Sequence, residues 1–157
     1  MRKPNPSLDK RDRAILRHLQ QDGRLSNLEL AQQINLSPSA CLRRVKLLED
    51  RGLISRYVML IDEQAAGLPG TAFVQITLDQ QGRAALDAFE KAIHQHAEIT
   101  ECCLLAGAAD YMVRVVYADA ADFERIHTEI LTQLPGVVRV QSTLALRTVK
   151  KTTALPV

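Results

Sequence analysis

The chain of 157 residues contains no tryptophan, and its aromatic content is only 4%, from three tyrosines and three phenylalanines. Leucine, isoleucine, valine and alanine must therefore build the core, and with 46% apolar residues the chain can form one ordinary domain or two small ones. It lacks the run of about 20 apolar residues that spans a membrane, and residues 1–6 lack the apolar stretch of a secretory signal. We therefore expect a cytoplasmic protein with no membrane partner.

Cysteine is also scarce, with residues only at positions 41, 102 and 103. The three form no Cys-x-x-Cys pair and have no nearby histidine at the spacing of a metal site, so we expect no metal. On a strand, Cys102 and Cys103 would point to opposite faces, which disfavours a disulfide between them. We expect small, buried, unreactive thiols, and a redox-sensing role for Cys102 or Cys103 is the alternative.

Net charge is nearly absent as well, at +2, and taken alone this value would argue against a nucleic-acid partner. The average conceals a division. Residues 1–60 carry twelve basic and six acidic side chains, a charge of +6, whereas the remainder carries eight basic and twelve acidic side chains, a charge of −4. Opposite signs in the two halves indicate two modules, of which the basic one is the candidate for binding a polyanion.

The basic half is typical of three short helices. Residues 8–22 have helical apolar spacing, with Asp9 as the expected N-cap and Gly23 as the stop. Ser26 and Glu29 have the spacing of a capping box, which predicts a second helix that ends near Ile34. Residues 37 and 38 are Ser-Pro, a preferred N-cap followed by proline at the first helical position, and they predict a third helix.

The second and third helices, joined by a turn at Asn35, predict a helix-turn-helix. The third helix begins with small polar residues and continues with basic ones, a surface that can enter the major groove of DNA. Because this region is almost free of aromatic residues, duplex DNA is a better partner than single strands. A plain helical hairpin with solvated charges is the alternative. The expected DNA-binding residues are Ser37, Pro38, Ser39, Ala40, Arg43, Arg44 and Lys46.

Residues 53–61 are typical of a strand, and the two glycines and one proline in residues 62–70 predict a linker. We therefore expect a DNA-binding domain at 1–61, the linker at 62–70 and a second domain at 71–157. The second domain alternates strands (71–78, 99–105, 111–117, 137–149) with helices (82–95, 120–134). This βαββαβ order predicts a ferredoxin-like fold, and the chain is of the α+β class. Apolar residues on both faces of strand 111–117 indicate that the uncovered sheet face packs on another subunit, in a homo-oligomer.

These residues resemble the Lrp/AsnC, or feast/famine, family of bacterial and archaeal transcription regulators. The resemblance covers nearly the whole chain and rests on Leu-Asp-Lys-Arg-Asp (8–12), Leu-Ser-Pro-Ser-Ala-Cys-Leu-Arg-Arg-Val-Lys-Leu-Leu-Glu (36–49), Gly-Ala-Ala-Asp-Tyr (107–111) and Leu-Pro-Gly (134–136). It implies a winged helix-turn-helix that binds double-stranded DNA. It also implies a C-terminal domain that dimerises, assembles dimers into octamers and binds small effectors, commonly amino acids.

By position, the resemblance implies an effector site between dimers, formed by Gly107, Ala108, Asp110, Tyr111, Ser142 and Thr143. An amino acid presents both charges, so it needs N–H or hydroxyl donors for its carboxylate and an acidic group for its ammonium. A glycine turn, two hydroxyls and Asp110 would provide them, unless Asp110 only caps its own turn. Ala108 stands where the family often has an acidic or polar residue, which leaves open a weak response or none.

We therefore expect a sequence-specific DNA-binding regulator that responds to an amino-acid-like effector through changes in oligomeric assembly, with no cofactor. An architectural DNA-binding protein without a dedicated effector is the alternative. An enzyme is disfavoured, because the chain has no glycine-rich phosphate loop, and His94 and His96 end a helix without a third metal ligand. The sequence leaves open the identity of the effector, the operator, and the choice between activation and repression.

Overall fold

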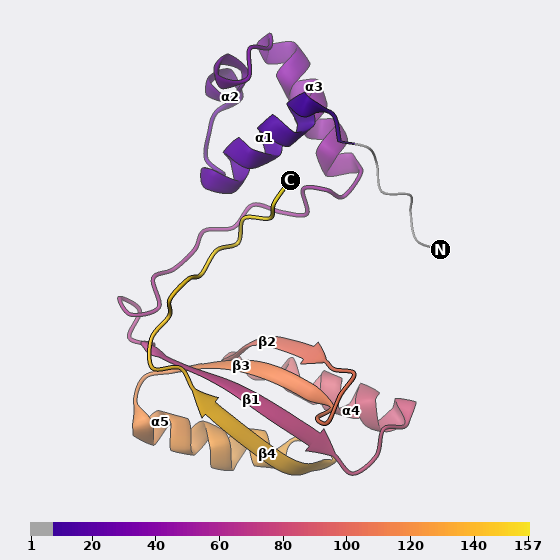
Figure 1. The fold of residues 1–157 in the computed structure, drawn as a ribbon, viewed down its shortest axis with the longest axis vertical. Coiled ribbons are helices and arrows are strands. Elements are labelled where there is room, and N and C mark those ends of the chain that lie inside the picture. Colours follow the sequence, from indigo (N-terminus) through magenta and orange to yellow (C-terminus); the bar gives the residue numbers. More distant parts are fainter. Residues whose placement is uncertain (1–7) are drawn as a thin grey trace. The chain divides into compact units, whose positions relative to one another are not determined.

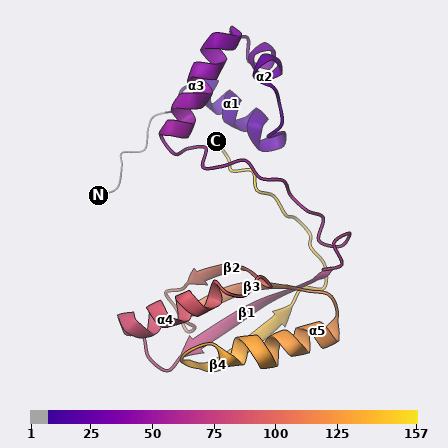
Figure 2. The ribbon, with the colours of Figure 1, turned by 180° about the vertical axis from the view of Figure 1, so that it is seen from behind.

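The computed structural model describes residues 8–157, which divide into two compact units (Figures 1 and 2). The first unit ends at Leu60 and also takes in Lys150–Val157, and the second unit is Ile61–Val149. The second unit thus begins near the start of the expected linker. The C-terminal assignment differs from the expected domain 71–157, because Lys150–Val157 packs with the first unit.

The first unit contains α1 (Lys10–Gln21), α2 (Asn27–Gln33) and α3 (Pro38–Asp50). All three expected N-caps are present. The Asp9 carboxylate accepts hydrogen bonds from the Arg11 and Asp12 amides, and Ser26 and Glu29 form a complete capping box. Asn35 adopts a positive φ of 53° in the turn between α2 and α3, a conformation that asparagine tolerates better than most residues.

The apolar faces of these helices meet in one small core. Helical spacing in the sequence already placed its members on the inner faces, and Ala31 is small enough to let α2 lie close to its neighbours. The buried members of this core are Ile15, Leu16, Leu30, Ala31, Cys41 and Leu48.

The prediction of a strand at residues 53–61 is wrong. The Leu53 and Ile54 amides both donate to the Leu48 carbonyl, and the chain then continues without regular structure as far as Ile61. Val58–Ile61 is a run of four exposed apolar residues. A strand needs a neighbour to accept its hydrogen bonds, and no other segment within residues 8–157 forms a ladder with this one.

The second unit has the order β1 (Gly70–Leu78), α4 (Arg83–Ile93), β2 (Ile99–Leu104), β3 (Tyr111–Tyr117), α5 (Ala120–Arg125) and β4 (Val137–Leu144). After α5 the helix continues as a wider π turn over Ile126–Ile130 and a 3₁₀ turn over Leu131–Gln133. The sheet is antiparallel, with strand order β2-β3-β1-β4. This arrangement confirms the ferredoxin-like fold, although β4 ends at Leu144 rather than at Val149.

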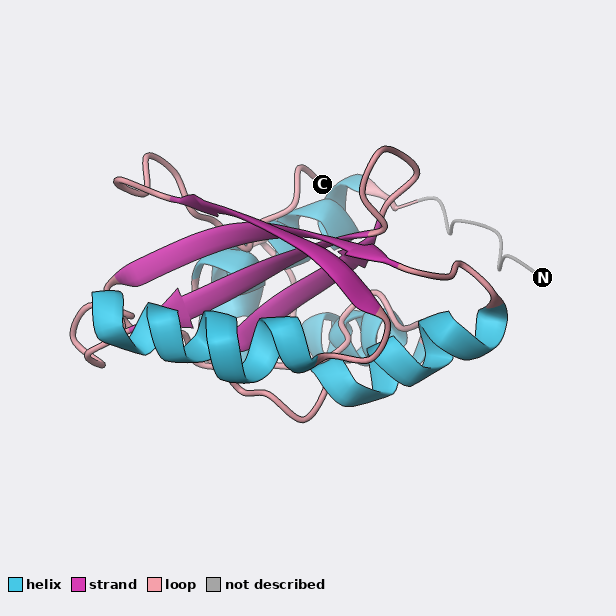
Figure 3. Ribbon diagram, turned by 90° about the horizontal axis from the view of Figure 1, so that it is seen from below, coloured by secondary structure: helices cyan, strands magenta, loops and turns pink. Residues whose placement is uncertain are grey.

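The helices of this unit lie along one face of the sheet and bury a core beneath them (Figure 3). Phe89 of α4 packs on Tyr111 of β3 with ring centroids 4.4 Å apart. On the opposite face Phe73 is 44% exposed, and the Arg114 guanidinium contacts the Glu63 carboxylate at 2.9 and 3.0 Å. That ion pair attaches the start of the linker to the uncovered face of the sheet.

Candidate nucleic-acid interface and effector site

The start of α3 is held by contacts from both sides of the turn. The Ser37 hydroxyl accepts a hydrogen bond from the Ala40 amide at 3.3 Å, so it caps the helix. From α2, the Asn27 side-chain amide donates to the Pro38 carbonyl at 2.8 Å. Asn27 was not among the expected site residues, yet it fixes the turn of the helix-turn-helix.

Most of the expected DNA-binding residues lie on an accessible surface of α3. Ser37, Pro38 and Ser39 are exposed at its first turn, and Arg43 and Lys46 are exposed one and two turns further on. Ala40 is half-buried. A small, polar tip followed by free-standing cations is the surface that major-groove binding requires.

Arg44 differs from its neighbour Arg43. Its Nη1 lies 2.7 Å from Asp9 Oδ2 and 2.7 Å from Asp12 Oδ1, so it joins α3 to the start of α1. Asp12 is buried, and the Arg44 side chain is only 26% exposed. The hydrogen bonds from the Asp12 amide and the Arg44 guanidinium lower the pKa of Asp9. Arg44, one of the expected DNA-binding residues, is therefore engaged in ion pairs within the first unit.

Sequence reasoning missed an apolar residue on the same surface. Leu42, beside Arg43, is 58% exposed, and Leu47 is 40% exposed. An exposed apolar side chain on a recognition helix can contact the methyl group of thymine. The signal was present, since helical spacing from the buried residues Cys41 and Leu48 places Leu42 away from the core.

The expected effector residues do not form one surface. Gly107 and Ala108 are exposed in the loop between β2 and β3, but Asp110 and Tyr111 turn inward. The Asp110 carboxylate accepts from the Leu78 amide and from the Gln81 side chain, both at 2.7 Å. The Tyr111 ring is fully buried, and its hydroxyl donates to Glu90 at 3.0 Å. The Asp110 carboxylate thus holds the end of β1 in place. It is neither a free acidic group nor a cap on its own turn.

Ser142 and Thr143 lie on opposite faces of the sheet. Ser142 pairs with Val74, which faces the helices, whereas Thr143 pairs with Phe73 on the uncovered face. Paired residues of antiparallel strands share a face, so the two hydroxyls cannot line one pocket within a subunit. The Ser142 hydroxyl oxygen is buried and has no hydrogen-bond partner among the residues described.

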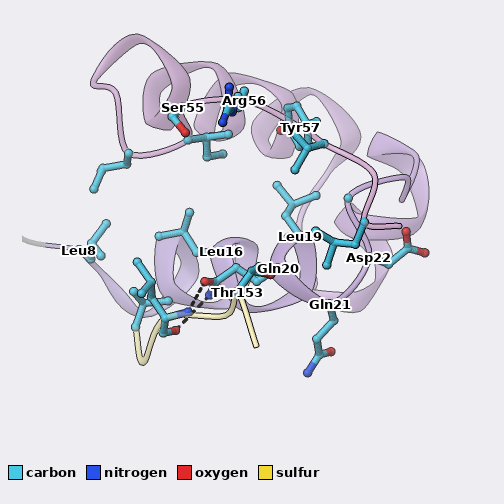
Figure 4. Close-up of a pocket in the computed structure, with 17 residues that line it drawn as sticks. Leu8, Leu16, Leu19, Gln20, Gln21, Asp22, Ser55, Arg56, Tyr57 and Thr153 are labelled. Atoms are coloured by element: carbon cyan, nitrogen blue, oxygen red, sulfur yellow. Dashed lines mark hydrogen bonds between the residues drawn. The ribbon is translucent and has the colours of Figure 1, made fainter. Parts of the chain in front are cut away.

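A cavity of about 590 Å³ lies in the first unit, away from every expected site residue. α1, residues 53–60 and the C-terminal segment line it, mostly with apolar side chains such as Leu16, Leu19 and Leu53 (Figure 4). The Gln20 side chain hydrogen-bonds the C-terminal segment at its edge. Sequence reasoning could not find this cavity, because its walls are distant in the chain.

The thiols are of two kinds. Cys41 is buried as expected, and burial raises its pKa. Cys102 and Cys103 are exposed, so the expectation of burial is wrong for them, because β2 is an edge strand. Their side chains face opposite sides, since Cys102 pairs with the core residue Val113. Although Cys102 is exposed overall, partial desolvation of its thiol, followed by the neighbouring Cys103 and Glu90, raises the pKa of Cys102 to about 11, which keeps it protonated near neutral pH.

Within residues 8–157, no three of the histidine, cysteine and acidic side chains come together in a way that could hold a metal ion. His127 is half-buried, and its ring lies 6.4 Å from that of Phe123. In the same part of the chain, every helix is too short or too polar to cross a membrane.

Two family models match the chain, one in each half. Residues 8–55 match the family model for a winged helix-turn-helix DNA-binding domain, and residues 71–155 match the model for the Lrp/AsnC ligand binding domain. The leucine-responsive regulatory protein of Escherichia coli K12 is 35% identical over 154 residues, which are 98% of this chain and 94% of that protein.

Solved structures extend the similarity to the fold. A transcriptional regulator from Neisseria meningitidis, in complex with L-methionine, has a TM-score of 0.91 at 35% identity, over 96% of this chain and 97% of its own. A feast or famine regulatory protein from Mycobacterium tuberculosis, also complexed with L-methionine, has a TM-score of 0.80 at 34% identity, over 92% and 96%. With matching models for both parts and relatives spanning nearly its full length, the chain belongs to the Lrp/AsnC family of transcriptional regulators.

Proposed function

We propose that this transcriptional regulator reads specific duplex sequences with the first two turns of α3. The observation that carries the proposal is the difference between two adjacent arginines. Arg43 is exposed, whereas Arg44 is held by Asp9 and Asp12. In this arrangement Arg43 reaches a base edge or a phosphate, Lys46 binds a phosphate and Leu42 contacts an apolar base edge. Arg44 keeps α3 correctly placed on α1.

Selection of duplexes from a random library tests this proposal, because it identifies the bound sequence without a known operator. Arg43→Ala is then compared with Arg83→Ala, a matched change at an exposed arginine of α4 in the second unit. If Arg43 reads a base, its loss costs about 1–3 kcal/mol of binding to the selected duplex and relaxes the preference at one position. If Arg43 contacts a phosphate, affinity falls for all duplexes and the salt slope decreases by about one.

Two results would contradict this part. Equal affinities of the Arg43→Ala and Arg83→Ala variants would remove Arg43 from the interface. Recovery of no preferred sequence, with uniform coating of any duplex, would instead support an architectural DNA-binding protein.

We further propose that the second unit binds an amino acid at the exposed loop around Gly107 and Ala108. Two relatives of this chain are described as complexes with L-methionine, and an extra Cβ at Gly107 would meet no atom within 4 Å, so a ligand can approach the backbone there. Since Asp110 is already engaged, the ammonium group of the ligand needs an acidic partner from elsewhere. If the site is shared between two copies, Glu101 or another exposed carboxylate of the neighbouring subunit would provide that partner.

A thermal-shift screen of the twenty amino acids, beginning with L-methionine, tests the effector. The shift produced by the bound amino acid should disappear in Ala108→Arg and persist in Ala84→Arg, a matched change on exposed α4. A shift retained by both variants would place the site elsewhere, and no shift with any amino acid would contradict an amino-acid effector.

The uncovered sheet face, with the half-exposed Phe73, is the surface proposed to pack on a second copy. Because the DNA-binding and effector surfaces lie on different units, the effector acts by favouring one assembly over another. Sedimentation velocity and DNA footprints with and without saturating ligand test this mechanism, and identical results in both conditions would refute it.

A further inference from the structure

The C-terminal segment returns to the first unit and binds α1. The Gln20 side chain pairs with the backbone of Leu155 in both directions (Figure 4). Its Nε2 donates to the Leu155 carbonyl at 3.2 Å, and its Oε1 accepts from the Leu155 amide at 2.6 Å. Val157 packs against the apolar core that contains Ile15 and Leu16. The segment is therefore fixed to the first unit by specific contacts, among them two hydrogen bonds and one apolar contact.

This attachment is light. A cavity of about 590 Å³ remains between α1, residues 53–60 and the segment, and the Leu155 side chain is 69% exposed. A short terminal segment whose contacts include one amide pair and one partly buried side chain, and whose Leu155 side chain is mostly exposed, can detach without unfolding the helices beneath it. The contact has the character of a reversible attachment and not of a core element.

The other end of the same stretch is fastened to the sheet. The Ala145 amide, directly after β4, donates to the Thr71 carbonyl of β1 at 2.9 Å. The chain thus leaves the second unit twice, once through the linker before β1 and once after β4 (Figures 1 and 2). While Leu155 is bound to Gln20, the second connection is anchored at both ends. When the segment is released, this second connection is free at its C-terminal end.

We propose that residues 150–157 form a latch whose attachment to α1 limits the freedom of the DNA-binding unit relative to the sheet. This inference rests on the proposed function and deepens it by naming a means of regulation. In an oligomer, two latched units are pre-organised to engage two half-sites, because less freedom is lost on binding. Releasing the latch removes that pre-organisation and leaves each recognition helix intact.

The test compares the full chain with Gln20→Ala, which removes both hydrogen bonds to Leu155, and with a chain that ends at Thr152. Gln21→Ala is the matched control, since Gln21 is the exposed neighbour of Gln20 on α1. Hydrogen exchange at the Leu155 amide reports on attachment. Affinity is measured for the selected duplex as a single half-site and as two half-sites, spaced by a full helical turn or by half a turn more.

We expect the Leu155 amide to be protected in the full chain and in Gln21→Ala, and unprotected in Gln20→Ala. The preference for full-turn spacing should fall by about threefold or more in Gln20→Ala and in the shortened chain, as expected when pre-organisation is lost. Affinity for a single half-site should stay unchanged, which shows that the helix-turn-helix remains folded.

Three results would overturn the latch: an unprotected Leu155 amide in the full chain, protection that disappears on dilution and so comes from a second copy, or equal spacing preferences in all variants. Failure of the proposed function gives a different result, because the unaltered chain would then select no duplex at all.

Discussion

The contrast between Arg43 and Arg44 gives a prediction that can be worked out from distances. Arg44→Ala removes two charged hydrogen bonds of 2.7 Å, to Asp9 and to Asp12. The Asp9 side chain is 50% exposed, so water replaces most of its lost contact. The Asp12 side chain is only 12% exposed, and a charged hydrogen bond to such a group is worth about 1.5–3 kcal/mol.

We therefore expect Arg44→Ala to lower the free energy of unfolding of the first unit by about 2 kcal/mol. Amide hydrogen exchange in α1 and α3 measures this loss locally, without interference from the second unit. A loss of about 2 kcal/mol corresponds to exchange roughly 30-fold faster for amides that open by unfolding of that unit. Arg43→Ala, at an exposed position, should change exchange by less than about twofold, within the usual effect of a surface substitution.

The DNA affinities of the same two variants should show the opposite order. Arg43→Ala weakens binding, whereas Arg44→Ala keeps the salt slope of the unaltered protein once stability is compensated by lower temperature. The reasoning is refuted if Arg44→Ala exchanges no faster than Arg43→Ala, or if it reduces the salt slope by about one, as the loss of a phosphate contact would.

Three further predictions concern single groups. Asp110→Asn should lower the free energy of unfolding of the second unit by about 1–3 kcal/mol, because the new NH₂ group faces one of two donors, the Leu78 amide or the Gln81 side chain. Urea denaturation measures this loss, and the control Asp79→Asn, at an exposed position directly after β1, should have little effect. Ser26→Ala should cost the first unit about 1 kcal/mol, seen as roughly fivefold faster exchange in α2, and unchanged exchange would deny the capping box an energetic role. The pKa of Asp9 is lowered from 3.8 and that of Glu29 from 4.5, so their contributions are present above those values and are lost as the pH falls through the lower folded-state values. Acid titration of first-unit exchange should therefore show destabilisation below about pH 4 that is smaller in Asp9→Asn, and an identical acid profile in that variant would contradict this assignment.

Local signals in the sequence were sufficient for most elements of both units. The caps at Asp9, Ser26 and Ser37 act within three residues of themselves, and Asn35 marks the turn that follows α2. Such contacts form between neighbours in the chain, so composition and spacing reveal them directly. The prediction of a strand at residues 53–61 was wrong because a strand depends on hydrogen bonds to a partner strand, and the pattern of one segment does not reveal whether such a partner exists.

The candidate site could be predicted only in part. Exposure of Arg43 and Lys46 follows from helical spacing, because Cys41 and Leu48 take the inner face. The opposite orientations of Ser142 and Thr143 also follow from strand alternation, once β4 is known to include both. The inward direction of the Asp110 side chain does not follow from strand alternation, because the groups that donate hydrogen bonds to its carboxylate come from β1 and the loop after β1.

The sequence by itself determined that the chain has a basic helix-turn-helix half and an acidic ferredoxin-like half, since these depend on short-range periodicity, capping and charge. Only the tertiary structure decided which polar and charged groups remain available. Arg44 is engaged by carboxylates of Asp9 and Asp12, and Gln20 is engaged by a segment from the far end of the chain. Long-range pairs of this kind depend on how elements pack and on where the chain returns, and no local pattern encodes either.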